Sequence, residues 1–541
     1  MHDDPIRDWT ADKTTFLGKR GAGSMKLLRS SALFGGMTLL SRVAGLVRDQ
    51  VQAALFGASA AMDAFLIAYR IPNLFRRIFA EGSFAQAFVP VFTDTLRRGS
   101  RDEVRDLLDH VAGALGSVLL IITALGIAFA PAITAVFAPG ALDEPVKFAL
   151  TTDMLRITFP YLFLISMVSL AGAVLNSHHH FGLPALVPVL HNLTIIAAAL
   201  FLAPRMEVPA MALAWGVAIA GVLQLLVLWP ALLRLGLLPR FRIDWRHPGV
   251  RRVFRLMLPT LFSSSAAQIN LIVGTVFASL LVTGSQTWLY LSDRLIEFPL
   301  GVFGVALGTV ILPHLARRNA DEDRDGYAAT LNWGVQWVLL LALPAALGLF
   351  LLAEPLSATI FQYGRFTPFD TRMAALAIAA MSIGVPGFML TKVLAPAFFA
   401  RQDARTPMRA ALKTVAFNLL LTIALVTPLW HYKIVGAHAG IAFATALAGL
   451  FNAWLLWRAL RRQGHSFAHP EWPRVLRGCV LGLLLMIASL MAMQSQVGAW
   501  GDLAPVMRVL LLLATVGLGA GAYLSGIWLA GVRPRHLREP T

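Results

Sequence analysis

Charged side chains lie inside the first two long apolar segments of the chain, where their types and spacing could bind an anion. The first segment carries Ser41, Arg42, Arg48 and Asp49; the second carries Asp63, Arg70, Asn73, Arg76, Arg77 and Glu81. A charge at the centre of a bilayer costs about 2.5–3.5 kcal/mol on insertion scales. Arginine binds phosphate and carboxylate groups through a planar fork of N–H donors. We therefore expect these residues to line a polar cavity for a charged cargo.

The spacing in the second segment places most of its charges on one face of a helix. At about 100° per residue, Asp63, Arg70, Arg77 and Glu81 fall within about 40° of one another, with Asn73 at the edge of the stripe. The same geometry predicts that Arg76 points away from the stripe, unless a proline bends the helix. Pro72 stands where it could do so.

Two later segments add further charges. They contribute Asp293, Arg294, Glu297 and Lys392, so that Arg and Lys outnumber Asp and Glu near the expected cavity. A purely structural alternative is that neighbours such as Asp293 and Arg294 pair and only fix helix packing. An excess of cations without partners is poor packing design, and it favours an anionic substrate.

The composition indicates the kind of protein that carries these charges. The chain has 541 residues, of which 57% are hydrophobic and 14% charged, and its mean hydropathy is +0.68. Soluble proteins are about 25% charged. Long, uniformly apolar runs predict helices rather than barrel strands, so the fold class is an all-α polytopic membrane protein. The single cysteine, Cys479, excludes an internal disulfide.

About fourteen segments are long and apolar enough to be membrane spans. We place them at 30–56, 62–92, 107–137, 149–175, 184–203, 209–233, 254–283, 287–313, 328–361, 371–399, 407–430, 436–458, 475–496 and 503–531. The loops alternate in charge: one set holds 25 arginines, and the other holds only Lys147, Arg205, Arg365, Arg372 and Lys433. The positive-inside rule then puts both termini in the cytoplasm. The same bias explains the net charge of +17 without any nucleic acid.

A spacing of about 224 residues recurs along the chain and indicates an internal duplication. Pro131, Phe137 and Gly140 match Pro355, Phe361 and Gly364, and Arg70 matches Arg294. The spacing covers an even number of spans, so both halves insert in the same orientation, as a parallel repeat of two six-helix lobes. We divide the chain into a disordered cytosolic extension (1–24), a first lobe (25–235), a cytosolic linker (236–253), a second lobe (254–460) and two C-terminal spans with a cytosolic tail (461–541).

No metal site or cofactor is expected. His178, His179 and His180 are adjacent and point in different directions, so a solvated loop explains them better than a metal. His191 and Asn192 are expected to form hydrogen bonds between helices. There is no Walker A motif to support an ATPase, which leaves the membrane potential, an ion gradient or the substrate's own gradient as the energy source.

Several charged motifs together resemble the MurJ (MviN) family of lipid II flippases, in the MOP exporter superfamily. They are 41–49 (SRVAGLVRD), 62–65 (MDAF), 70–82 (RIPNLFRRIFAEG), 84–90 (FAQAFVP), 293–299 (DRLIEFP), 304–309 (GVALGT) and 392–396 (KVLAP). The resemblance runs from about Met25 to the C-terminus.

The resemblance implies a bacterial inner-membrane protein that carries lipid II, an undecaprenyl-diphosphate-linked disaccharide-pentapeptide, to the periplasmic leaflet by alternating access. By motif match, the cavity residues required in the family correspond to Ser41, Arg42, Arg48, Asp63, Arg76 and Arg294, with Asp49, Arg77, Glu81, Glu297 and Lys392 as charged positions nearby. The last two spans resemble a groove for the lipid tail. Membrane lipids and cell-wall synthesis enzymes are the other implied partners.

The resemblance also bears on sodium, which some members of the family bind through acidic residues. Here the seventh span offers Gln268 and Asn270 but no carboxylate, and the eleventh span has none, so a sodium site is doubtful.

Other functions stay open at this point. Within transporters, the alternatives are a flippase for another prenyl-linked glycan and a cation-coupled drug exporter, although an exporter is expected to show carboxylates rather than excess arginine. A membrane glycosyltransferase would need catalytic carboxylates at the aqueous boundary, and Asp143, Glu144 and Asp502 form no convincing site. A scaffold for cell-wall enzymes would leave the buried arginines unexplained.

Overall fold

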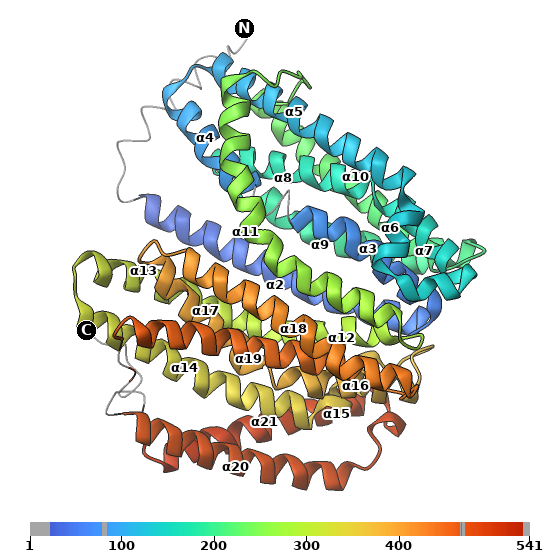
Figure 1. The fold of residues 1–541 in the computed structure, drawn as a ribbon, viewed down its shortest axis with the longest axis vertical. Helices are drawn as coiled ribbons and strands as arrows, with labels where there is room; N and C mark the ends of the chain where they lie inside the picture. Colours follow the sequence, from blue (N-terminus) through green and yellow to red (C-terminus); the bar gives the residue numbers. More distant parts are fainter. Residues whose placement is uncertain (1–21, 78–83, 466, 468–470, 534–541) are drawn as a thin grey trace.

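The computed structural model describes residues 22–77, 84–465, 467 and 471–533, and these form helices and turns without strands. The helices of the first half are α2 (Ala22–Phe56), α3 (Ala60–Arg76), α4 (Ala85–Arg98), α5 (Arg101–Ala128), α6 (Ala130–Phe137), α7 (Pro145–Thr158), α8 (Tyr161–Ser177), α9 (Gly182–Ala197) and α10 (Met211–Leu235). They surround one apolar core and form the upper part of the molecule in Figure 1.

The second half forms another bundle with its own core. Its helices are α12 (Ser285–Pro299), α13 (Val305–Ala320), α14 (Arg324–Leu351), α15 (Ala353–Phe361), α16 (Pro368–Ser382), α17 (Val385–Phe399), α18 (Arg405–His431) and α19 (His438–Arg462). The last pair, α20 (Trp472–Val497) and α21 (Pro505–Leu529), packs on α14 and α15 at the outer edge of this bundle (Figure 1).

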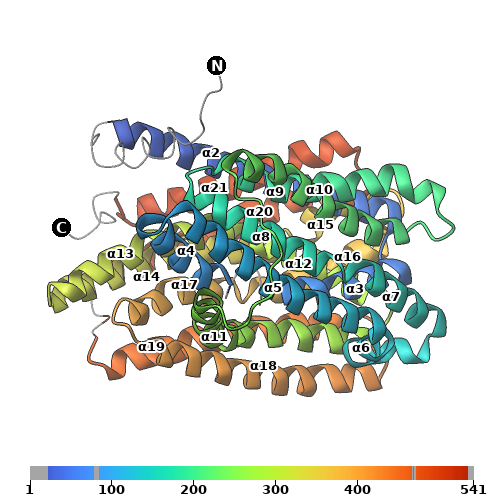
Figure 2. The same ribbon diagram turned by 90° about the horizontal axis from the view of Figure 1, so that it is seen from above.

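One helix belongs to both bundles. The first residues of α11 (Pro248–Ser279), among them Val250 and Val253, lie in the first core, and the helix packs there against α4 and α5. Its later part packs against α18 and α19 (Figures 1 and 2). The boundary at 254 between linker and second lobe therefore falls inside a continuous helix, because apolar periodicity marks a buried face without saying which neighbour buries it.

Helix ends follow ordinary capping chemistry. The Ser59 hydroxyl accepts the backbone N–H of Met62 and starts α3, after a turn in which Gly57 has φ +60°. Capping boxes start α5 at Ser100 and α16 at Thr367. These caps fix the short turns between helices and thereby the relative placement of the charged helices.

Ten helical segments in the described part of the chain are long and apolar enough to cross a membrane, or eleven if α16 and α17, bent by 40° at their junction, form one span. The chain is thus a multi-pass helical membrane protein, as its composition predicts. The count of fourteen spans stays a prediction.

Candidate substrate cavity between the lobes

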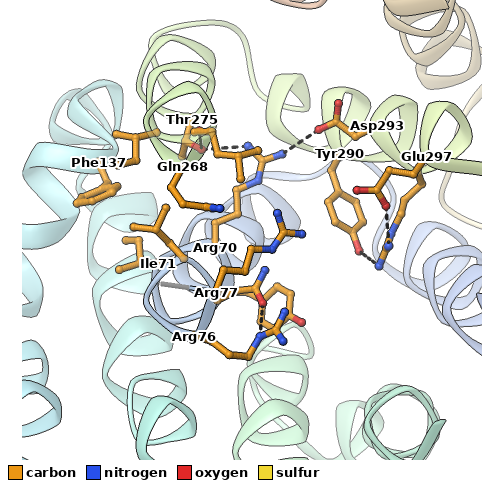
Figure 3. Close-up of a pocket in the computed structure, with 16 residues that line it drawn as sticks. Arg70, Ile71, Arg76, Arg77, Phe137, Gln268, Thr275, Tyr290, Asp293 and Glu297 are labelled. Carbon is orange, nitrogen blue, oxygen red and sulfur yellow. Dashed lines mark hydrogen bonds and ion pairs between the residues drawn. The ribbon is translucent and has the colours of Figure 1, made fainter. Parts of the chain in front are cut away.

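A cavity of about 220 Å³ lies between α3 on the first lobe and α11 and α12 on the second (Figure 3). Its cations outnumber its carboxylates four to two: Arg70, Arg76, Arg77 and Arg294 against Asp293 and Glu297. The other lining residues are Tyr69, Ile71, Asn73, Leu74, Phe137, Gln268, Leu271, Ile272, Thr275 and Tyr290.

Helical periodicity brings these side chains to the cavity. On α3, Arg70, Asn73 and Arg77 are separated by three and four residues, and on α12 Tyr290, Arg294 and Glu297 are separated by four and three. Such spacings put each set on one helix face, and the two faces meet across the lobe interface.

The centre of the interface is a buried charge network that crosses the lobes. The guanidinium of Arg48, 3% exposed, donates to Asp49 Oδ1 at 2.6 and 3.0 Å, to Asn192 Oδ1 at 3.0 Å and to the Tyr290 hydroxyl at 2.7 Å. Tyr290 donates in turn to Asp49 Oδ1 at 3.0 Å. Asp49 is therefore held from the second lobe as well as from its own helix.

Arg294 closes the network from the second lobe. Its Nε lies 2.9 Å from Asp49 Oδ2, an ion pair by distance that lacks the alignment of a hydrogen bond. Its Nη groups reach the Tyr290 hydroxyl at 3.3 Å and Glu297 at 3.4 Å. Arg294 is a third exposed, so this cation keeps access to the cavity.

Arg70 forms a second set of contacts across the lobes. Its Nη1 donates to Thr275 Oγ1 at 3.0 Å and to Gln286 Oε1 at 3.2 Å, and its Nη2 lies 3.9 Å from Asp293. Figure 3 shows Arg70 reaching from α3 toward Thr275 and Asp293. Arg70 thus pairs between the lobes, as Arg294 does with Asp49, while Arg48 pairs with Asp49 on its own helix. Asp293, which the structural alternative paired with its neighbour Arg294, lies near Arg70.

The cavity's other two cations lie at the end of α3. Arg76 donates from Nε to Asn73 Oδ1 at 2.8 Å and lines the cavity, which is the direction that the spacing allowed only if Pro72 re-aims the side chain. Pro72 interrupts the hydrogen bonding inside α3, and the long side chain turns back along the helix to Asn73. Among the described residues Arg77 has no side-chain partner, and Glu81 lies outside the described residues.

Asp63 holds the lobes together at a different place. Its carboxylate, 1% exposed, accepts the backbone N–H groups of Gly284 and Thr287 at 2.7 and 3.0 Å and the Thr287 hydroxyl at 2.7 Å. These groups start α12, so Asp63 of the first lobe caps a helix of the second. It is absent from the cavity lining.

Ser41, Arg42 and Lys392 are also absent from the lining of this cavity. The Ser41 carbonyl accepts Asn192 Nδ2 at 3.0 Å, which positions the amide that binds Arg48. The exposed side chain of Arg42 lies against Gly301, so closely that a Cβ on this glycine would overlap the Arg42 guanidinium. Lys392 is exposed on α17.

The sequence analysis missed Tyr290 as a site residue. Its hydroxyl contacts Arg48, Asp49 and Arg294, and it stands one helical turn before Arg294, a signal that extending the stripe of α12 would have found. The prediction that His191 and Asn192 bond between helices is confirmed: His191 Nε2 lies 3.1 Å from the Tyr69 hydroxyl, and Asn192 bonds α2.

The sequence makes a sodium site doubtful because the seventh span offers two neutral amides in place of carboxylates. Gln268 lines the cavity, while Asn270 Oδ1 accepts Asn418 Nδ2 from α18 at 3.2 Å. The hydrogen bond of Asn270 joins α11 to α18.

One end of the lobe interface is sealed by two glycine turns from the repeated motif. The N–H of Gly140 lies 3.3 Å from Ser279 Oγ at the end of α11, and a Cβ on Gly140 would overlap the Ser279 carbonyl. Gly364, at φ +55°, meets the Ala54 carbonyl at the end of α2 in the same way, and the next N–H, of Arg365, bonds that carbonyl at 2.8 Å. The glycines are 224 residues apart and their partners 225 apart, so each lobe makes the same contact on the other.

Two helical lobes with a cation-rich cavity between them define the class of a membrane transporter. Two solved structures share the fold: one titled "Lipid II flippase MurJ, inward closed conformation" (TM-score 0.74, 23% identity, 92% of this chain and 100% of that one) and an inward-facing multidrug resistance MATE family transporter of the MOP superfamily (TM-score 0.63, 13% identity, 78% and 95%).

The sequence relatives give the family. The family model described as "Lipid II flippase MurJ" matches residues 52–510. The chain is 41% identical over 527 residues to a probable lipid II flippase MurJ of Vibrio cholerae, covering 96% of this chain and 99% of that protein, and 40% identical over 523 residues to a lipid II flippase MurJ of Burkholderia cenocepacia, covering 95% and 99%. The chain belongs to the MurJ family.

Proposed function

We propose that this chain moves lipid II from the cytoplasmic to the periplasmic leaflet of a bacterial inner membrane, by alternating access of the cavity between its lobes. The observation that carries the proposal is the excess of arginine in that cavity, in a chain of the MurJ family. A diphosphate is an anion that arginine forks bind well, and water in the cavity suits the sugars and the peptide.

The size of the cavity supports a moving pair of lobes. Pockets for drug-sized ligands measure about 300–1,000 Å³, and a disaccharide-pentapeptide is larger than a drug. A cavity of about 220 Å³ cannot hold such a headgroup. The lobes must therefore part before loading, and Asp49 must exchange Arg294 and Tyr290 for other partners when they do.

The direction of opening follows from the sealed end. The turns at Gly57, Gly140, Gly284 and Gly364 lie at the end that carries Lys147, Arg365 and Arg372, which is the arginine-poor side of the chain. Under the positive-inside rule this side is periplasmic. We infer a conformation closed toward the periplasm, in which Arg76 and Arg77, at the far end of α3 from the turn at Gly57, lie on the cytoplasmic side of the cavity.

The energy source and the lipid tail complete the proposal. A membrane potential negative inside favours outward movement of an anionic cargo. Exposed apolar side chains on α20 and α21, such as Leu484, Leu513 and Leu524, suit a surface that faces lipid, where the prenyl chain can remain.

Complementation of a depleted flippase tests the proposal. We expect the wild-type chain to restore growth and to expose lipid II at the outer leaflet to an externally added modifying enzyme. Arg294→Ala should lose both, Arg294→Lys should keep a part, and Arg156→Ala is the matched control, since Arg156 is an exposed arginine paired with Asp153. Full transport by Arg294→Ala at normal membrane levels would contradict the role of the cavity.

Reconstitution separates the alternative cargoes. Vesicles are loaded with lipid II or with an undecaprenyl-diphosphate that carries a different glycan. The two lipids should be flipped at different rates if the protein distinguishes their headgroups. Equal rates would reduce the proposal to a flippase for prenyl diphosphates. Transport of a cationic drug without lipid flipping would replace it by a drug exporter.

A further inference from the structure

Two histidines and an aspartate meet far from the cavity, where the linker joins α11. Asp106 and His110 lie one turn apart on α5, and His247 is the N-cap residue of α11. One donor atom from each of the three lies within 4.8 Å of the others. We propose that this cluster binds a divalent transition-metal ion of the Zn²⁺ type.

The donor set suits such an ion. Imidazole nitrogen and carboxylate oxygen are ligands of Zn²⁺, and two histidines with one carboxylate leave room for a water. His110 Nδ1 lies 2.8 Å from the Asp106 backbone carbonyl and 3.3 Å from Asp106 Oδ1. When Nδ1 carries the proton and donates it to the carbonyl, Nε2 keeps the lone pair for an ion. A carbonyl in this position orients metal-binding histidines.

His247 has the complementary arrangement. Its Nε2 lies 3.0 Å from Asp106 Oδ2, and its buried Nδ1 has no partner among the described residues. The rings of His110 and His247 stack with centroids 4.5 Å apart and planes within 2°.

The surroundings hold the cluster in place. The segment before His247 lies along α5: the Arg240 N–H bonds the buried Asp109 carboxylate at 2.7 Å, and the Arg242 N–H bonds the Asp109 carbonyl at 3.2 Å. A Cβ on Gly113 would overlap the Arg242 backbone, so the contact is close. A metal at the cluster would therefore fix the start of α11 to the first lobe.

One nearby cation opposes the ion and offers a specific test. Arg242 Nη1 lies 3.9 Å from Asp106 Oδ1, and its side chain is 56% exposed, so it can move away. Removing this charge by Arg242→Ala should tighten metal binding, by up to about fivefold for an exposed pair. Adventitious binding at another place on the surface would not respond.

The experiment is zinc binding to the full chain, purified with a tag that contains no histidine. After dialysis against a chelator, titration calorimetry and metal analysis should give one Zn²⁺ per wild-type chain. His110→Ala, His247→Ala and Asp106→Asn should each weaken binding by tenfold or more, since even outer-shell partners are worth about 10–100-fold. His180→Ala, an exposed histidine in the turn after α8, should bind as the wild type does.

Folding is checked on the same samples. Zinc should raise the thermal midpoint of the wild type and of His180→Ala, and leave that of Asp106→Asn, the most conservative variant, unchanged. Equal stoichiometry and affinity in all variants, or no binding by the wild type, would overturn the proposal. Both outcomes are independent of lipid flipping, so they leave the proposed function untouched.

Discussion

The sealed end and the centre of the contact between the lobes are built from different chemistry. At the sealed end, main chain meets main chain: Gly140 lies against Ser279, and Gly364 lies against Ala54. At the centre, Arg48, Asp49, Tyr290 and Arg294 meet through charged and hydroxyl groups. Backbone contacts of this closeness are either made or lost, because any added atom separates them.

Charged groups behave differently, since they can exchange one partner for another. Asp49 takes contacts from two arginines and a tyrosine, and an anionic headgroup offers the arginines an equivalent acceptor. The glycine turns therefore hold the sealed end by close main-chain packing, whereas the charge network can exchange partners without losing its hydrogen bonds.

The largest expected effect comes from breaking the network on one side. Arg48→Ala leaves Asp49 buried with its nearest cation removed, and the loss of one partner of a buried pair costs about 3–5 kcal/mol. We expect a clear fall in thermal stability in detergent and no complementation.

The matched variant for this prediction is Arg48→Ala with Asp49→Ala. Removing both charges should restore a large part of the stability but not transport, if Arg48 also serves the cargo. Recovery of transport by the double variant would show that the pair only holds the helices together.

The second largest effect should come from adding one carbon to the glycine turns. Gly364→Ala combines a left-handed backbone, at about 1–2 kcal/mol, with overlap of the Ala54 carbonyl. Gly140→Ala adds overlap alone. Both should open the sealed end, Gly364→Ala more than Gly140→Ala.

Thiol labelling measures this opening. A reporter, Ala53→Cys, lies 2% exposed at the sealed end, in a background where the single native cysteine is replaced by Cys479→Ala. Labelling by an impermeant reagent should rise in both glycine variants. Gly521→Ala is the control, because a Cβ on this glycine of α21 would meet open space. Labelling no higher than in that control would show that the glycine turns do not keep the sealed end closed.

How much of this arrangement the sequence predicts depends on the range of the interaction. Helical spacing correctly brought Arg70 and Arg77 to one face of α3 and pointed to α12 as a second charged helix, because periodicity is local. It could not show that Asp49 meets Arg294, since the two are far apart in sequence and join only when the lobes pack. For Arg76 it left two directions open, because a helical wheel treats the helix as regular and does not say how Pro72 re-aims the side chain.

The glycine turns show what a repeat can and cannot predict. The sequence marked Gly140 and Gly364 as equivalent positions, but equivalence alone gives no partner. The partners are main-chain atoms, which carry no signature in the sequence. The role of Asp63 as a helix cap was hidden for the same reason, because two of its three donors are backbone N–H groups.

Asp63 provides the third prediction, since it combines a charge with a backbone contact. Asp63→Ala should cost about 2 kcal/mol, by leaving buried N–H groups at the start of α12 without an acceptor. Asp63→Asn keeps one acceptor oxygen and should cost less.

Thermal unfolding ranks the two variants, and labelling of Ala53→Cys should follow the same order if the cap also helps to close the sealed end. An Asn variant as damaged in transport as the Ala variant, yet stable, would instead place the charge of Asp63 in the cargo path.

Tyr290→Phe should give the smallest effect, and it separates the hydroxyl from the ring. The variant removes one donor to Asp49 and one acceptor for each arginine, while both ion pairs to Asp49 remain. Arg48 keeps Asp49 and Asn192 as acceptors and Arg294 keeps Glu297, so the uncompensated loss is the bond to Asp49. One such hydrogen bond contributes about 0.5–1.5 kcal/mol net, so stability should fall by about 1 kcal/mol. Transport should be slowed rather than lost, because the cations that bind an anion are unchanged.

Tyr363→Phe, whose hydroxyl bonds the Thr359 carbonyl away from the network, is the control. Complete loss of transport in Tyr290→Phe would mean that the hydroxyl itself binds the cargo, and the network would then be a binding site in which the ion pairs are secondary.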